Sequence, residues 1–297
     1  MPLVCCGLAF LGTLGFVCFQ MGKFDKAEAF LREGIRFKQA LGDLAGAADA
    51  LFNLAMAMLW LGEFEEVDRL LAPTIASFTK TGAANEATRL QALQVMAQTL
   101  LGRYTEALEI AEAGLYYART SGLEREMGIL LWVLGYLSIA AVEYDKAEKQ
   151  LLESTRILQS LGLLDILASA QVARGYAALD LNDLGLAYHH FSEAIPRRPD
   201  TQSNGVVILA LPGIALLMAR SGNVTLGIEL DALAAHYPLI ANSRFFEEDA
   251  RLPLAALFAD MPDEEIAQAR ARAEKLDLET AILVILDGLR DMAFISI

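Results

Sequence analysis

The chain has 297 residues, of which 55% are hydrophobic, and it carries a formal net charge of −14. This acidic balance repels phosphate backbones, so it argues against direct nucleic-acid binding. The three cysteines, Cys5, Cys6 and Cys18, lie near the N-terminus without metal-site spacing. Their placement argues against a disulfide framework and favours a reducing, cytoplasmic compartment.

The first predicted element is the apolar stretch at residues 3–21, LVCCGLAFLGTLGFVCFQM, which is uncharged and nearly as long as a membrane span. It has neither a basic n-region nor an A-x-A cleavage site. It also fits the repeat spacing described next. We therefore expect a buried repeat helix, with an export signal or membrane anchor as the alternative.

A sequence motif recurs every forty residues. It reads MGKFDKAEAFLREGI at residues 21–35, LGEFEEVDRLLAPTI at 61–75 and LGRYTEALEIAEAGL at 101–115, with an altered copy at 141–155. The marker column holds Gly22, Gly62, Gly102, Val142, Asn182 and Gly222. A second column, midway between, holds Gly42, Gly82, Gly122 and Gly162. Because glycine just past a helix end readily takes the left-handed conformation, these columns predict the turns between helices.

Between the glycines, apolar residues recur at helical spacing, as in Leu51, Leu54, Ala55 and Met58. A single helical hairpin cannot bury its apolar face, but stacked hairpins can. We therefore expect one solenoid over residues 1–290, with repeats near 4–40, 44–80, 84–120, 124–160, 164–200, 203–240 and 244–275. Repeat six should be weakened by Pro212, and a closing helix at 277–289 should precede a tail at 291–297.

The columns resemble the tetratricopeptide repeat: a glycine before Phe or Tyr, an alanine three residues later, then a bulky and a small residue. The glycine of the family's first helix is matched by Gly15, Gly135 and Gly175, and its closing proline by Pro199. The family's usual period is about 34 residues, so forty implies longer helices. The resemblance implies an all-α, right-handed superhelical solenoid of antiparallel helix hairpins, with about seven repeats plus a closing helix.

The C-terminal end is similar to the ends of repeat regions in bacterial multidomain signalling regulators. These include signal-transduction ATPases, LuxR-type activators and cyclase-linked proteins. No Gly-rich phosphate loop, HExxH or GxSxG motif occurs in the sequence. His189 and His190 are adjacent on a predicted helix, so their side chains diverge by about 100° and cannot share one metal. We therefore expect a protein without enzymatic activity, cofactor or metal.

In the resembled family, the first helix of each hairpin lines a concave groove. Carried over to this chain, the groove residues are Phe16, Phe19, Phe52, Met56, Leu59, Arg89, Met96, Trp132, Tyr136, Ile139, Val172 and Tyr176. The family's carboxylate clamp needs several basic side chains, and Arg89 is the lone one, so a clamp is disfavoured. The apolar residues either pack across a tight superhelix or receive an amphipathic helix, a peptide or an apolar ligand.

The sequence therefore favours a non-enzymatic protein- or peptide-binding scaffold or sensor module within a larger bacterial signalling or transcription regulator. The alternative is a small-ligand sensor whose superhelical cavity holds an apolar or sugar-like effector. The first helix is apolar around its whole circumference, with Leu3, Leu8, Leu11 and Leu14 among its residues. Such a helix must be buried on every side. We therefore expect a homodimer through the N-terminal hairpin.

Overall fold

The computed structural model describes residues 11–20, 23–195 and 204–295, and all regular secondary structure within these ranges is helical. The predicted all-α fold is thus confirmed. The chain forms two compact units, unit 1 (Met1–Leu130) and unit 2 (Leu131–Ile297), and helix α8 (Glu124–Ala140) runs across the boundary. Within the described residues, no helix is long and apolar enough to cross a membrane.

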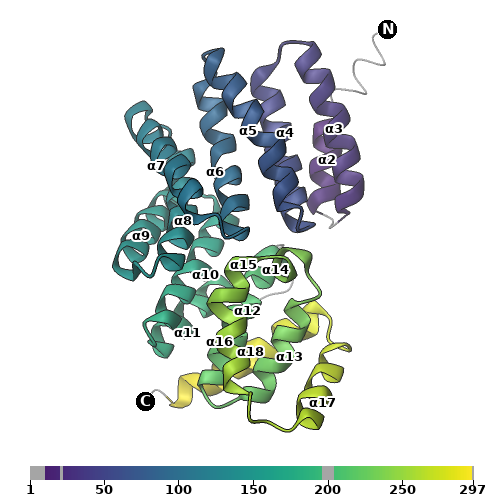
Figure 1. The fold of residues 1–297 in the computed structure, drawn as a ribbon, viewed down its shortest axis with the longest axis vertical. Coiled ribbons are helices and arrows are strands. Elements are labelled where there is room, and N and C mark those ends of the chain that lie inside the picture. The colour runs from purple at the N-terminus through teal and green to yellow at the C-terminus, as the bar shows by residue number, and fades with distance from the viewer. Residues whose placement is uncertain (1–10, 21–22, 196–203, 296–297) are drawn as a thin grey trace. The chain divides into compact units, whose positions relative to one another are not determined.

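Unit 1 consists of antiparallel helices joined by short turns (Figure 1). Helices that follow each other in the chain pack together, and α4 also contacts α6, so alternate helices form a layer. The bounds are α2 (Leu11–Gln20), α3 (Phe24–Ala40), α4 (Leu44–Trp60), α5 (Phe64–Lys80), α6 (Ala84–Leu100) and α7 (Tyr104–Ser121). The pairs α2–α3, α4–α5 and α6–α7 are the hairpins that the forty-residue spacing predicts.

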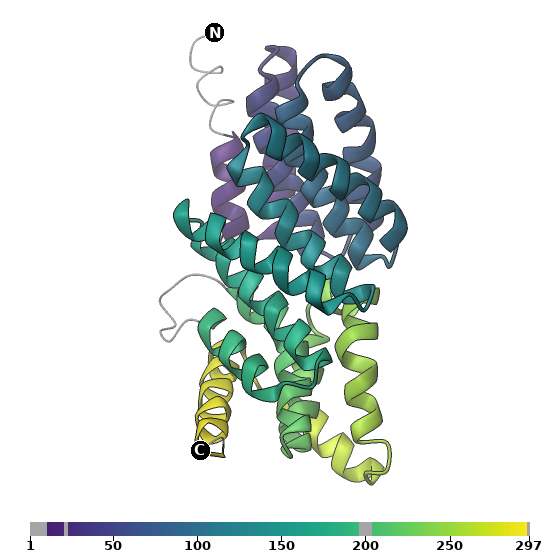
Figure 2. The ribbon, with the colours of Figure 1, turned by 90° about the vertical axis from the view of Figure 1, so that its left-hand side faces the viewer.

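Unit 2 continues with hairpins and ends in shorter helices. Its helices are α9 (Tyr144–Ser160), α10 (Leu164–Asp180), α11 (Leu184–Ala194), α12 (Asn204–Arg220), α13 (Val224–Ala234), α14 (Pro238–Ala241), α15 (Arg244–Phe246), α16 (Leu252–Leu257), α17 (Asp263–Ala273) and α18 (Leu278–Ile295). A π-helical turn, η1 (Glu247–Arg251), joins α15 to α16. The last helix, α18, packs against α11 and α12 (Figures 1 and 2).

The closing helix is longer than predicted, because α18 ends at Ile295 and not at residue 289. Gly288 lies within this helix, where a Cβ atom would be 3.3 Å from the Met218 sulfur. This glycine therefore permits a close helix approach and does not end the helix. Because α18 extends to Ile295, most of the predicted tail at 291–297 is helical.

The turns have the left-handed backbone that the glycine columns predict. Positive φ angles occur at Gly42, Gly62, Gly82, Gly102, Gly122, Gly162 and Gly222. The same conformation persists where the marker column carries a side chain, with φ of 62° at Val142 and 56° at Asn182. The hairpin geometry therefore imposes the turn even on a β-branched residue, which normally avoids it.

Small residues inside the helices let neighbouring helices come close. A Cβ atom at Gly175 of α10 would lie 2.6 Å from Cε1 of Phe191 in α11. At Gly135 of α8, it would lie 2.3 Å from Cδ2 of Leu151 in α9. Phe191 and Leu151 are themselves fully buried. The column of small residues therefore packs directly against the column of bulky residues, as the repeat pattern predicts.

Pro212 does not break α12, which runs from Asn204 to Arg220. The hydroxyl of Tyr176 on α10 accepts a hydrogen bond from the Gly213 N–H (3.0 Å) and donates one to the Leu209 C=O (2.9 Å). These are the two groups that a regular helix would join directly. The tyrosine thus satisfies the backbone at the point where proline distorts the helix.

Candidate functional site

The predicted groove residues of unit 1 lie on α4 and α6, the first helices of their hairpins. Phe52 and Met56 on α4 are half-buried. Leu59 and Met96 are only 4% and 8% exposed and belong to the core. Of the predicted groove residues in unit 1 whose side chains the structure describes, Phe52, Met56 and Arg89 are therefore the ones that remain within reach of solvent.

Arg89 is held between two carboxylates on the same face of unit 1. Its guanidinium donates to Asp49 of α4 and, at 3.2 Å, to Glu126 at the start of α8. Next to them, the Arg125 guanidinium lies 5.5 Å from the centre of the Phe52 ring, within cation–π range. Because Arg89 is already neutralised by its own neighbours, this face is not prepared to clamp a partner's carboxylate.

The predicted groove residues of unit 2 are buried within the unit. Trp132 is 8% exposed, Tyr136 2% and Tyr176 0%, and Ile139 and Val172 are also buried. The ring centres of Trp132 and Tyr136 lie 6.1 Å apart in an edge-on arrangement. These five side chains therefore form part of the interior of unit 2.

Two phenylalanines of α15 cover the tyrosines of this cluster. The Phe245 ring lies 5.1 Å from that of Tyr136 and 6.1 Å from that of Tyr176, both edge-on. The Phe246 ring lies 5.9 Å from that of Tyr176. Edge-on contacts at these separations are favourable aromatic pairs. In unit 2, a segment of the same chain thus occupies the surface on which a partner was predicted to dock.

A pair of carboxyl groups lies next to this aromatic cluster. The side chains of Asp180, the last residue of α10, and Asp249, in η1, are joined by a hydrogen bond. Such a bond requires a proton on one of the two groups. Burial, together with the charge of Asp180, raises the pKa of Asp249 well above its ordinary value, so Asp249 is the donor.

Asp180 is the partner that ionises first. Burial raises its pKa to about 6, although the hydrogen bond from Asp249 and the positive charge of Arg220 oppose the shift. Arg220 also donates to the Leu179 C=O at 2.5 Å, which fixes its position at the end of α12. At neutral pH the pair therefore holds one proton and one negative charge, facing one arginine.

A buried polar atom in the same cluster lacks a partner. Among the described residues, Asp249 Oδ2 is buried without a hydrogen-bond donor, whereas the buried Tyr136 hydroxyl has a hydrogen bond with the Trp132 side chain. Burial raises the pKa of Tyr136, so its hydroxyl is neutral. Unsatisfied buried polar groups are rare in folded proteins.

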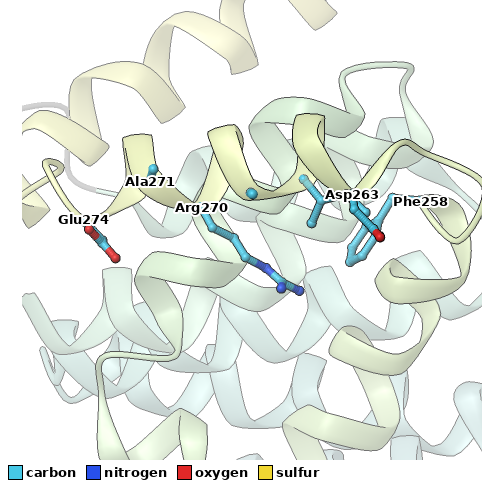
Figure 3. A pocket seen from close by; sticks show the side chains of 7 residues that line it. Phe258, Asp263, Arg270, Ala271 and Glu274 are labelled. Atoms are coloured by element: carbon cyan, nitrogen blue, oxygen red, sulfur yellow. The ribbon is translucent and has the colours of Figure 1, made fainter.

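Two open hollows lie elsewhere on the surfaces of the units. One, of about 610 Å³, runs along α17 and is lined by Phe258, Asp263, Ile266, Ala267, Arg270, Ala271 and Glu274 (Figure 3). The other, of about 280 Å³, lies in unit 1 and is lined by Gly12, Thr13, Lys38, Gly46, Asp49, Ala50 and Asn53. Both mix small, apolar and charged side chains and present no converging set of catalytic groups.

The adjacent histidines of α11 diverge as predicted. His190 is buried, whereas His189 is exposed. Burial, with a contribution from the Arg174 charge, lowers the pKa of His190 to about 4, so it is neutral at pH 7. In the part of the chain that the structure describes, no group of three or more His, Cys, Asp or Glu side chains is placed to hold a metal ion.

The remaining predicted groove residues, Phe16 and Phe19, have side chains outside the described residues. The sequence pattern did not identify Phe245, Asp180 or Asp249 as members of a site. The consecutive phenylalanines of RFFEED were a visible signal, but the pattern assigned them only to the first helix of a seventh hairpin. The two aspartates are far apart in the chain and carried no local signal.

A family model of the tetratricopeptide repeat matches residues 8–41. This match covers the first predicted hairpin and agrees with the repeat pattern found in the following ones. No curated protein matches the chain.

Proposed function

We propose that the chain is a non-enzymatic interaction module that binds a protein or peptide through the first helices of its hairpins. The tetratricopeptide match supports a protein-interaction scaffold in general, because stacked hairpins present an extended face. The observation that carries the proposal is the face of α4, where Phe52 and Met56 stay partly exposed beside a row of charged side chains.

The chemistry of this face favours an amphipathic helix with basic residues at its rim. Met56 is flexible and polarisable, and such side chains adapt to varied apolar partners. The Asp49 carboxylate is 62% exposed and could accept a second cation besides Arg89. The net charge of −14 would draw a basic partner towards the chain from a distance.

Site-specific photocrosslinking tests this proposal. A benzophenone amino acid replaces Met56 in one variant and Glu112, an exposed residue of α7, in a matched control. We expect a discrete adduct in cells only from position 56, and Phe52→Asp should remove it while the far-UV circular dichroism stays unchanged. Equal adducts from both positions, or none from position 56, would contradict the proposed face.

We further propose that the module belongs to a larger bacterial signalling or transcription regulator and forms a homodimer. The resemblance of its C-terminal end to bacterial regulators supports the proposal of a larger regulator.

The proposal of a homodimer is supported by Leu14 and Val17 of α2, each 46% exposed. Light scattering at micromolar concentration tests the dimer: a monomer of 32.3 kDa, unchanged by Leu14→Glu, would refute it.

A further inference from the structure

One face of helix α17 is open to solvent along its whole length. Ala269 and Ala273 are buried where the helix packs into unit 2, but the side chains that line the hollow of about 610 Å³ are exposed or half-buried. Those on the helix recur at intervals of three and four residues, so they share one face. We call this face the α17 stripe; it consists of Asp263, Ile266, Ala267, Arg270, Ala271 and Glu274.

The stripe carries its charges in a fixed order. Asp263 lies at its start, Arg270 two turns later and Glu274 one turn further. The side chains of Arg270 and Glu274 point to the same side of α17 (Figure 3). Arg272 is bound to Glu229 of α13 at 2.6 Å. In contrast, the Arg270 guanidinium has no ion pair or hydrogen bond within the described part of the chain, so it is available to a partner.

The stripe defines what an occupant must carry. It needs a carboxylate against Arg270 and a cation against Asp263. These two charges must lie about 10.5 Å apart along the helix, because the two residues are seven positions apart. Between them the occupant needs one small and one bulky apolar side chain, to match Ile266 and Ala267. Alanine at this position lets a second helix approach closely.

The α17 stripe is its own complement. In an antiparallel pair of α17 helices related by a two-fold axis between residues 266 and 267, Asp263 of each copy lies against Arg270 of the second copy. Ile266 then lies against Ala267 of the second copy, so a bulky side chain faces a small one. We propose that α17 is a self-association face and that its occupant is the same helix of a second copy in antiparallel orientation. This inference does not depend on the α4 face or on the N-terminal hairpin.

The charges of the whole helix favour the antiparallel orientation. The first turn of α17 is acidic, with Asp263, Glu264 and Glu265, and its last turn is basic, with Arg270 and Arg272. Antiparallel pairing places the acidic end of one helix beside the basic end of the other and opposes the two helix dipoles. Parallel pairing in register would bring like charges together instead.

The contact is small and the chain is acidic, so the pairing should be weak. Only about two helical turns of each copy overlap, which is well below a standard interface. The net charge of −14 also repels a second copy at long range. At physiological ionic strength the Debye length is only about 8 Å, so the ion pairs within the contact decide the orientation.

Disulfide trapping of the full chain tests the geometry. The three native cysteines are first replaced by serine, and Leu14→Glu removes the proposed N-terminal contact. Ala267→Cys then places two thiols about 1.5 Å apart along the helix direction, and we expect a disulfide-linked dimer under mild oxidation. Ala271→Cys is the matched control on the same stripe. Its two thiols would be about 13.5 Å apart along that direction, too far to join.

Charge exchange tests the ion pairs. In the Ala267→Cys chain, Arg270→Glu should slow trapping about tenfold, because two attractive pairs become repulsive. Asp263→Lys should slow it as well, although it makes the chain less acidic and would speed trapping if net charge alone mattered. The two changes together restore both pairs with exchanged signs and should return the rate to that of the parent. Glu274→Gln, outside the overlap, should change the rate little.

Equal trapping from positions 267 and 271, or no trapping from position 267 at millimolar concentration, would overturn the proposal. A double variant as slow as the single variants would overturn it as well. Recovery in the double variant also excludes unfolding of α17 as the cause of the losses, because a second change cannot refold the helix by restoring an ion pair between copies. A disulfide adduct of position 267 with a different protein in cells, in place of the dimer, would assign the face to another partner and refute self-association.

Discussion

Val142→Gly should stabilise the protein, because Val142 occupies a left-handed turn that its side chain resists. Its φ is 62°, and its side chain, 68% exposed, makes few contacts that a substitution would lose. The left-handed conformation costs a residue with a Cβ atom about 1–2 kcal/mol. Glycine is free of this cost but adds about 0.5–1 kcal/mol of unfolded-state entropy. A β-branched residue such as valine pays the upper end of the cost of the left-handed conformation. The expected net increase in the free energy of unfolding is therefore about 1 kcal/mol.

Urea denaturation, followed by circular dichroism, measures the change as a shift in midpoint at constant slope. Asn182→Gly is the matched comparison in the same column. Asn182 has a φ of 56°, and asparagine tolerates this region, so its gain should stay below about 0.5 kcal/mol. Gly82→Ala is the reverse change: a Cβ atom there meets nothing within 4 Å, so a loss of about 1 kcal/mol would report backbone strain alone.

The reasoning fails if Val142→Gly lowers the midpoint, or if Asn182→Gly raises it as much. The first result would mean that the valine side chain contributes more by packing than it costs by strain. The second would mean that glycine stabilises these turns for a reason unrelated to the Cβ atom.

Three further predictions follow from contacts in unit 2. Tyr176→Phe removes the hydroxyl that bridges α12 beside its proline, so thermal unfolding should show a loss of about 1–3 kcal/mol. Gly175→Ala drives a methyl group into the buried Phe191 ring and should lower the free energy of unfolding by about 1–2 kcal/mol, although alanine has the better helix propensity. Adding Phe191→Leu to this variant should recover part of the lost stability. Asp180 has a pKa of about 6 when folded against 3.8 ordinarily, so its stabilisation is complete below pH 3.8 and is lost as pH rises through 6. Relative to Asp180→Asn, the wild-type free energy of unfolding should fall by about 2–3 kcal/mol between pH 4 and pH 7, measured by urea titration at each pH.

The sequence predicted the helices and turns well because both depend on local chemistry. Helical spacing and the two glycine columns predicted where the turns lie. At Val142 and Asn182 the marker column has no glycine, but the left-handed turn is still present because the hairpin fixes the backbone there. The proline at position 212 was predicted to weaken the sixth repeat. The helix that contains it is continuous, because a tyrosine from another helix supplies the missing hydrogen bonds. A pattern within one helix cannot reveal such a tertiary partner.

The candidate site was only partly predictable for the same reason. The side chains of Tyr136 and Tyr176 were assigned to a concave face from their repeat positions, but α15, far along the chain, covers them. An aspartate at a helix end, such as Asp180, normally indicates a solvated turn. Its pairing with Asp249 depends on how the last hairpins fold back on α10, which forty-residue periodicity does not encode.

One column of the forty-residue repeat relates the proposed binding face of unit 1 to the aromatic cluster of unit 2. Positions 56, 96, 136 and 176 hold Met, Met, Tyr and Tyr, and burial increases from the half-exposed Met56 to the fully buried Tyr176. Equivalent positions of a repeat share backbone geometry, so an occupant that fits one member of the column indicates what fits another. Phe245 seated on Tyr136 shows that the column accepts an aromatic ring edge-on. We therefore expect the partner of unit 1 to place an aromatic side chain against Met56, where a sulfur–aromatic contact would replace the contact between Phe245 and Tyr136 found in unit 2.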